Sequence, residues 1–231
     1  MRTVAAMGTV AAVPPSHPET SPMKYRLAIF DFDGTLADSL PWFRSVFNGV
    51  ARNYGFRALN DAEFETLRGV GNREVIRRLG VPLWKMPMIA AHMRRMMAAD
   101  IDGIALFDGV PEMLRDLKAL DMRIAVVTSN SEENVRRVLG HRNAGLIDHY
   151  ACGASIFGKP PKFRQVLRRS GVPAHKTICI GDEVRDAEAA RSLGIPFAAV
   201  SWGYAKPELL ESQAPDRMFT AVGDIAAAVR G

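Results

Sequence analysis

Residues 25–33 read YRLAIFDFD, an apolar run that ends in two aspartates and continues as GTLADS to residue 39. The run is too short for a typical helix and stops at Asp-Gly, which is typical of a buried strand in a parallel sheet. Carboxylates so close together repel each other and resist burial, so Asp31 and Asp33 destabilise the fold unless a cation or a hydrogen-bonded site compensates. The stretch therefore predicts a strand that delivers two charges to a functional site.

Three later apolar runs are similar to the first one and alternate with helical patterns. They read MRIAVVTSN at 122–130, TICIGD at 177–182 and FAAVSWG at 197–203. Helical patterns lie between the runs, at 110–121, 131–140, 161–171 and 185–194. Strands that alternate with helices predict an α/β fold with a doubly wound, Rossmann-like parallel sheet, which binds its ligands at the carboxyl ends of the strands.

The stretch 39–107 interrupts this alternation. Its apolar residues recur at helical spacing and no strand pattern intervenes, so we expect a helical cap domain inserted after the first strand. The α/β core then comprises residues 23–38 and 108–231. Hinges are expected at 37–39 and 107–109, because a cap must open for substrate and close to exclude water.

Composition excludes several classes of protein. The 231 residues are 48% hydrophobic and 24% charged, which suits one large domain or a domain with a lid. No apolar stretch approaches the roughly 20 residues of a membrane span. The net charge of +5 comes from arginine pairs scattered over separate segments, which is typical of solvated helix faces rather than of a nucleic-acid site. We therefore expect neither a membrane nor a nucleic-acid partner; the oligomeric state is left open.

The first residues and the cysteines bear on location. Residues 1–22 contain four prolines and no convincing signal sequence, so we expect a disordered extension, with Met23 a candidate natural start. Cys152 and Cys179 cannot form a disulfide framework or a metal cluster by themselves. A reducing, cytoplasmic setting fits this composition best.

Polar side chains follow the predicted strands at the points where they end. Carboxylates follow the first run and the TICIG run, Thr128 and its neighbours follow the VVTSN run, and Lys159 lies in a separate GKPPK segment. In a parallel sheet these strand ends meet at one edge. Carboxylates there would hold a hard divalent ion, most simply Mg²⁺, while donors at a helix N-terminus and a lysine would hold an anion. The pattern therefore predicts a phosphate site.

The same residues resemble a known family. DFDGTLADS at 31–39, VVTSN at 126–130, Lys159 in GKP and IGDEVRDAEAARSLGIP at 180–196 are similar, in order and spacing, to the four motifs of the haloacid dehalogenase-like hydrolase superfamily. The insertion resembles that superfamily's helical cap of the first type, and VSWGYAKPELL resembles its phosphoglycolate phosphatase-like branch. The resemblance covers about residues 24–225.

The resemblance implies a role for each motif residue. Asp31 would be the nucleophile and form an aspartyl-phosphate. Asp33 would protonate the leaving alkoxide and later take a proton from water. Mg²⁺ would be held by the Asp31 carboxylate, the Asp33 main-chain carbonyl and Asp182, and Lys159 would help to offset the repulsion between anions.

The resemblance also assigns supporting residues. The phosphoryl oxygens would be held by Thr128 and by the groups of Ser129 and Asn130. Asp186 would orient Lys159 or a metal-bound water rather than bind the metal. Glu183 fits two roles equally well. It could contact the metal ligands without binding the metal, or it could be a glutamate in the first turn of a helix, where the helix dipole favours a negative charge.

An acidic residue two positions after the nucleophile implies phosphoryl chemistry. The resemblance therefore predicts a Mg²⁺-dependent phosphatase for a small phosphorylated metabolite, with 2-phosphoglycolate as the leading candidate. A β-phosphoglucomutase-like phosphomutase is the alternative, and a non-catalytic binding protein with this fold is a more distant one. LRGVGNREVIRRLG at 67–80 resembles a cap specificity loop, which makes Arg68, Asn72 and Arg73 candidate substrate contacts; each arginine fits a plain surface position equally well.

Overall fold

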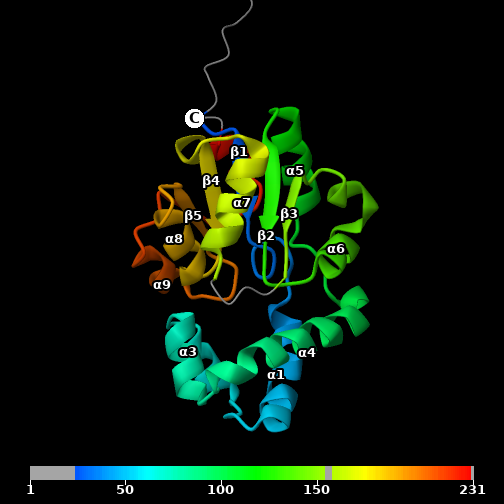
Figure 1. Ribbon diagram of the computed structural model, residues 1–231, viewed down its shortest axis with the longest axis vertical. Helices are drawn as coiled ribbons and strands as arrows, with labels where there is room; N and C mark the ends of the chain where they lie inside the picture. Colours follow the sequence, from blue (N-terminus) through cyan, green and yellow to red (C-terminus); the bar gives the residue numbers. More distant parts are fainter. Residues whose placement is uncertain (1–23, 154–157, 230–231) are drawn as a thin grey trace, which may run out of the picture.

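The structure is a computed structural model that describes residues 24–153 and 158–229 (Figure 1). The extension expected at residues 1–22 lies outside the described residues. Within the described part, no helix is both long and apolar enough to cross a membrane.

A parallel sheet of six strands forms the centre of the described chain. The strands run in the order β3-β2-β1-β4-β5-β6. Their bounds are β1 (Leu27–Phe30), β2 (Arg123–Val127), β3 (His149–Ala151), β4 (Thr177–Gly181), β5 (Phe197–Val200) and β6 (Arg217–Phe219). In the centre, Phe30 lies opposite Val126 on one side and Ile180 on the other. The predicted α/β class with a Rossmann-like parallel sheet is confirmed.

Helices cover both faces of the sheet. They are α5 (Val110–Ala119), α6 (Glu132–Ala144), α7 (Pro160–Ser170), α8 (Val184–Arg191), α9 (Pro207–Glu211) and α10 (Asp224–Ala228), with a 3₁₀ turn η3 (Ala174–Lys176). Successive side chains of a strand point to opposite faces. Ala28 and Phe30 therefore pack in a cluster with residues of α5, α6 and α10, and Leu27 and Ile29 in a cluster with residues of α7, α8 and α9. Burial on both faces is why the first strand is apolar throughout.

A helical insertion, residues 39–107, separates β1 from β2. It contains α1 (Leu40–Tyr54), α2 (Asp61–Leu67), α3 (Asn72–Leu79) and α4 (Met86–Ala99), with 3₁₀ turns η1 (Leu83–Lys85) and η2 (Ile101–Gly103). Figure 1 shows the insertion beyond the carboxyl ends of the strands. Its small apolar core is formed by Phe47, Leu59, Phe64 and Leu79. The division into a core and a separate cap domain stays a prediction.

The two connections to the insertion run side by side. The amide of Asp38 donates to the carbonyl of Ala105 at 2.9 Å, and the amide of Phe107 donates to the carbonyl of Leu36 at 3.0 Å. These segments coincide with the predicted hinges at 37–39 and 107–109, whose movement stays a prediction. The pairing holds both ends of the insertion next to the carboxyl end of β1.

Candidate active site

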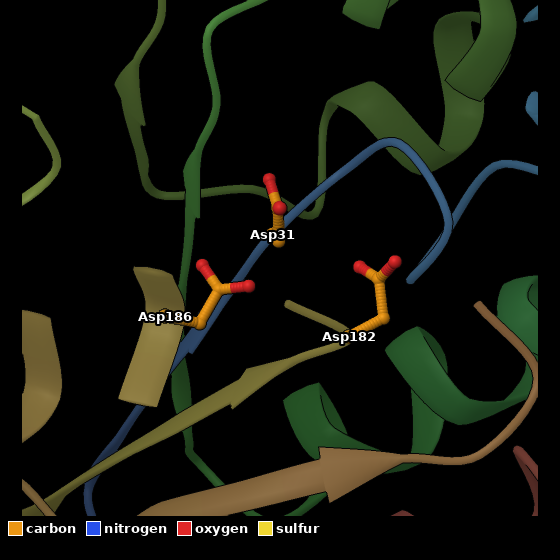
Figure 2. Close-up of side chains that lie close together, drawn as sticks. All are labelled: Asp31, Asp182 and Asp186. Carbon is orange, nitrogen blue, oxygen red and sulfur yellow. The ribbon is translucent and has the colours of Figure 1, made fainter. Parts of the chain in front are cut away.

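Three buried carboxylates gather beyond the central strands. Asp31 follows β1, Asp182 follows β4, and Asp186 lies in the first turn of α8, with one oxygen from each within 4.8 Å of the others. Figure 2 shows the three side chains around a shared space. Because β1 and β4 are parallel neighbours, residues more than a hundred positions apart meet at one edge. The sequence predicted this meeting for Asp31 and Asp182.

The Asp182 carboxylate is fixed by loops on either side. Thr35 Oγ1 donates to Oδ1 at 2.7 Å, and the amide of Tyr204 donates to Oδ2 at 2.8 Å. Two glycines make room for it: a Cβ at Gly203 would lie 2.2 Å from the Asp182 Cβ, and one at Gly34 would lie 2.3 Å from Oδ2. Burial, together with the neighbouring carboxylates, raises the pKa of Asp182 well above its usual range. A cation here would relieve that repulsion.

Lys159 lies between two of the carboxylates. Its Nζ is 2.5 Å from Asp31 Oδ2 and also pairs with Asp186 Oδ1. Although burial opposes the charged ammonium, the carboxylates of Asp186 and Asp31 raise the pKa of Lys159 above its usual value. Asp186 Oδ2 accepts a hydrogen bond from the amide of Glu183 at 3.1 Å, which caps α8. These contacts are the ones expected if Asp186 orients Lys159; that role stays a prediction.

Asp33 points to a different group of side chains. Its Oδ2 lies 3.2 Å from Asn130 Nδ2 and 3.5 Å from Thr128 Oγ1. The main-chain N–H of Asn130 donates to Thr128 Oγ1 at 3.0 Å. Burial and, next, the negative charge of Asp31 raise the pKa of Asp33 to about 6. Asp31 and Asp33 thus lie among different groups, and the raised pKa lets Asp33 carry a proton up to a pH of about 6.

Five of the predicted residues lie around one pocket. A cavity of about 280 Å³, which we call the catalytic pocket, lies between the core and the insertion. Its wall includes Asp33 and Asn130 together with three other predicted residues, Ser129, Glu183 and Asn72. Asn72 Nδ2 donates to Glu183 Oε1 at 3.1 Å, so the insertion touches the core here.

The two predicted arginines of the insertion do not line this pocket. The side chain of Arg68 donates to the carbonyl oxygens of Tyr204 and Gly203, and it pairs with Glu65 at 3.0 Å. Arg73 is exposed in the first turn of α3. Their role as substrate contacts stays a prediction, and in this arrangement Arg68 joins the insertion to the core.

Three residues near the site were missed by the sequence reasoning. Arg185 Nη2 lies 3.9 Å from Asp31 Oδ2, and its Nε pairs with Glu183. The three-residue spacing from Asp182 could have indicated it, because α8 begins directly after that strand. Tyr204 and Arg94 also line the catalytic pocket. The sequence around neither residue indicates a functional site, since each one reaches the pocket only through the tertiary fold.

Comparisons with known proteins agree with this geometry. The family model described as haloacid dehalogenase-like hydrolase matches residues 28–200. The chain belongs to the haloacid dehalogenase-like hydrolases. It is 30% identical over 202 residues to a phosphoglycolate phosphatase of Synechococcus elongatus, covering 87% of this chain and 95% of that protein. The predicted resemblance to the phosphoglycolate phosphatase-like branch is thereby confirmed.

Other relatives of this hydrolase carry different names. It is 29% identical over 202 residues to the tyrosine-protein kinase PtkA of Mycobacterium bovis, covering 85% of this chain and 68% of that protein. The crystal structure of CbbY from Rhodobacter sphaeroides in complex with phosphate is similar, with a TM-score of 0.68 and 26% identity over 87% of this chain and 96% of that chain. The shared fold thus carries more than one named activity, and the site must decide between them.

The donor set of this hydrolase fits a hard divalent cation. Three buried carboxylates offer only oxygen, which Mg²⁺ prefers, and they face the buried ammonium of Lys159 and the more distant guanidinium of Arg185. With Asp33 and Glu183 added, five carboxylates stand against these two cations at this edge of the sheet. A divalent cation would offset most of that excess negative charge.

Proposed function

We propose that this hydrolase is a Mg²⁺-dependent phosphatase that hydrolyses a small phosphorylated metabolite through an aspartyl-phosphate on Asp31. The observation that carries the proposal is that two neighbouring aspartates have different surroundings, which suit them to different chemical roles. The Asp31 carboxylate is buried beside the ammonium of Lys159, whereas Asp33 lies beside Asn130 and Thr128 and has a raised pKa that lets it hold a proton. The phosphoglycolate phosphatase among its relatives supports 2-phosphoglycolate as the leading candidate substrate.

Mg²⁺ would be held by the carboxylates of Asp31 and Asp182 and by the main-chain carbonyl of Asp33. When bound, it supplies positive charge that polarises the phosphoryl oxygens and reduces repulsion between the two anions. Asp182 is kept ready for it by Thr35 and Tyr204, whose hydrogen bonds fix both of its oxygens. Preorganised ligands of this kind need no rearrangement during the reaction.

The chain's own residues provide the two chemical steps. An oxygen of Asp31 attacks phosphorus, the bond from phosphorus to the alkoxide oxygen breaks, and Asp33 gives its proton to that oxygen. Asp33 then takes a proton from water as the water oxygen attacks the aspartyl-phosphate. This second step releases inorganic phosphate and restores Asp31.

Lys159 and the segment after β2 would hold the transferring group. The ammonium of Lys159, fixed by Asp186, offsets negative charge on the phosphoryl oxygens. Thr128 and the groups of Ser129 and Asn130 lie where the helix α6 begins, so they present donors to an anion. A tetrahedral phosphoryl group needs donors on several sides, and these residues come from two places, the segment after β2 and the start of α7.

A panel of phosphorylated metabolites tests the proposal. The purified protein with Mg²⁺ is expected to release inorganic phosphate from at least one member, with 2-phosphoglycolate and β-glucose 1-phosphate both included. Conversion of β-glucose 1-phosphate to glucose 6-phosphate without phosphate release would favour the mutase instead. Release of phosphate from no member, p-nitrophenyl phosphate included, contradicts the proposed function.

A further inference from the structure

The insertion contributes a single charged side chain to the catalytic pocket. From residues 39–107 the wall takes apolar groups such as Trp42, Met93 and Met97, the amide of Asn72 and the guanidinium of Arg94. The core contributes Ser129 and Asn130, two of the groups proposed to hold the phosphate, and the proposed proton donor Asp33. Because Arg94 lines the same pocket from the insertion, a substrate whose phosphate lies against the core can place its leaving group beside Arg94.

Arg94 also differs from the other arginines of the insertion. Five of them pair with a carboxylate: Arg44, Arg57, Arg68, Arg77 and Arg78. Those without such a partner among the described residues are Arg52, Arg73, Arg94 and Arg95. Three of these four are exposed, and Arg94 alone is half-buried. Among these four arginines, Arg94 is therefore the least exposed to water.

The guanidinium of Arg94 is little used by the protein. Its one hydrogen bond among the described residues runs from Nη1 to the carbonyl of Ser129, at a long 3.5 Å. A partly buried cation without an anionic partner is unfavourable, because burial removes water that would otherwise solvate it. An anion that arrives with the substrate would remove this penalty.

We propose that Arg94 is a specificity-determining residue of this site, which selects substrates that carry a carboxylate on the leaving group by binding that carboxylate. The inference rests on the proposed phosphatase function and deepens it. A guanidinium presents paired N–H donors that match the two oxygens of a carboxylate. In the same wall Arg185 pairs with Glu183, and Asp33 adds a further carboxylate, so Arg94 is left to compensate a singly charged carboxylate better than a second phosphate.

The test compares two substrates that differ in the carboxylate. Ethyl phosphate has the same two-carbon chain as 2-phosphoglycolate but no carboxylate. We expect the wild-type protein to prefer 2-phosphoglycolate in kcat/KM. Arg94→Met should reduce that preference by about ten- to a hundredfold, mainly through KM, because a charge-assisted hydrogen bond is lost. Arg94→Lys should restore part of it, since lysine keeps the charge but not the paired donors.

The neighbouring Arg95 provides the matched control. It is exposed and does not line the pocket, so Arg95→Met should have the wild-type kcat/KM for both substrates. Binding gives a second readout: with Asp31→Asn to prevent turnover, calorimetry should show weaker 2-phosphoglycolate binding when Arg94→Met is added. Equal losses for both substrates in Arg94→Met, or a wild-type protein that hydrolyses both esters equally well, overturn the proposal for Arg94. Hydrolysis of neither ester, nor of p-nitrophenyl phosphate, instead overturns the phosphatase function itself.

Discussion

Arg68 Nε of the insertion donates to the carbonyl oxygen of Tyr204 in the core at 2.9 Å. The amide of the same Tyr204 donates to Asp182, and its hydroxyl lies 3.1 Å from Ser39 Oγ, at the entry to the insertion. One residue of the core thus contacts the insertion, the hinge region and the carboxylate cluster. The position of the insertion and the geometry of Asp182 are therefore linked through Tyr204.

This link predicts that Arg68→Met lowers activity because it breaks the contact between the insertion and the core, rather than a contact with the substrate. Removing two charge-assisted hydrogen bonds to carbonyl oxygens should loosen the insertion and lower kcat/KM about tenfold or more. Steady-state kinetics measures the loss. Arg52→Met, at an exposed position of α1, is the control and should behave as the wild type. A fully active Arg68→Met protein would show that the contact is dispensable.

Gly203→Ala should displace Asp182. The new Cβ would lie 2.2 Å from the Asp182 Cβ, a distance that forces the loop or the aspartate to move. We expect a free energy of unfolding lower by about 1–3 kcal/mol, as for other overpacked sites, together with a large loss of activity. Thermal unfolding and phosphate release measure the two effects.

A second glycine provides the comparison for that variant. Gly223 has ordinary backbone angles and nothing within 4 Å of a new Cβ. Gly223→Ala should therefore change the free energy of unfolding by no more than about 0.5 kcal/mol, the usual range for surface substitutions. If Gly203→Ala is as active as Gly223→Ala, the tight seat of Asp182 has no catalytic importance.

The raised pKa of Asp33 predicts how activity depends on pH. Asp33 must carry a proton to act on the leaving group, and its pKa is raised to about 6 by burial and by Asp31. As pH rises above that value the protonated fraction falls, so the rate of alkoxide departure should decrease by up to about tenfold per pH unit. Single-turnover rates with ethyl phosphate measure this.

The leaving group offers an internal control for the pH profile. The p-nitrophenolate ion leaves without protonation, so single-turnover rates with p-nitrophenyl phosphate should fall less steeply over the same pH range. Identical profiles for the two esters would contradict the assignment of Asp33 as the proton donor. Asp33→Asn should remove the difference, because the amide carries no transferable proton.

Metal removal should affect stability as well as activity. Chelation should abolish phosphate release, and Mg²⁺ should restore it. Because the cation would bind the folded state alone, Mg²⁺ should also raise the melting temperature by a few degrees. In Asp182→Asn that rise should shrink or vanish. A melting temperature that does not respond to Mg²⁺ in the wild type contradicts a metal site at this cluster.

The sequence could predict the central strands of the sheet but not its edge strands. β1, β2, β4 and β5 are buried on both faces, and a continuous apolar run identified each of them. β3 (His149–Ala151) and β6 (Arg217–Phe219) lie at the edges and have three residues each, with polar or charged side chains among them. Such short edge strands carry no apolar run, and only pairing with β2 and β5 defines them.

The same division holds at the site. Asp31, Asp33 and Asp182 end strands, so sequence position alone placed them at one edge of the sheet. Tyr204 and Arg94 could not be found in this way, because the fold of a loop and the docking of α4 decide what they face. Residues on the insertion are the least predictable, since their contacts depend on how two separate parts of the chain meet.

The central claim is that Asp31 carries the phosphoryl group. Acid quenching of the reaction within the first turnovers, followed by mass spectrometry of the peptides, tests it most directly. We expect one phosphoryl adduct on the peptide that contains Asp31 in the wild-type protein. The Asp31→Asn protein should show no adduct and no phosphate release. An Asp31→Asn protein that releases phosphate at the wild-type rate would contradict the account.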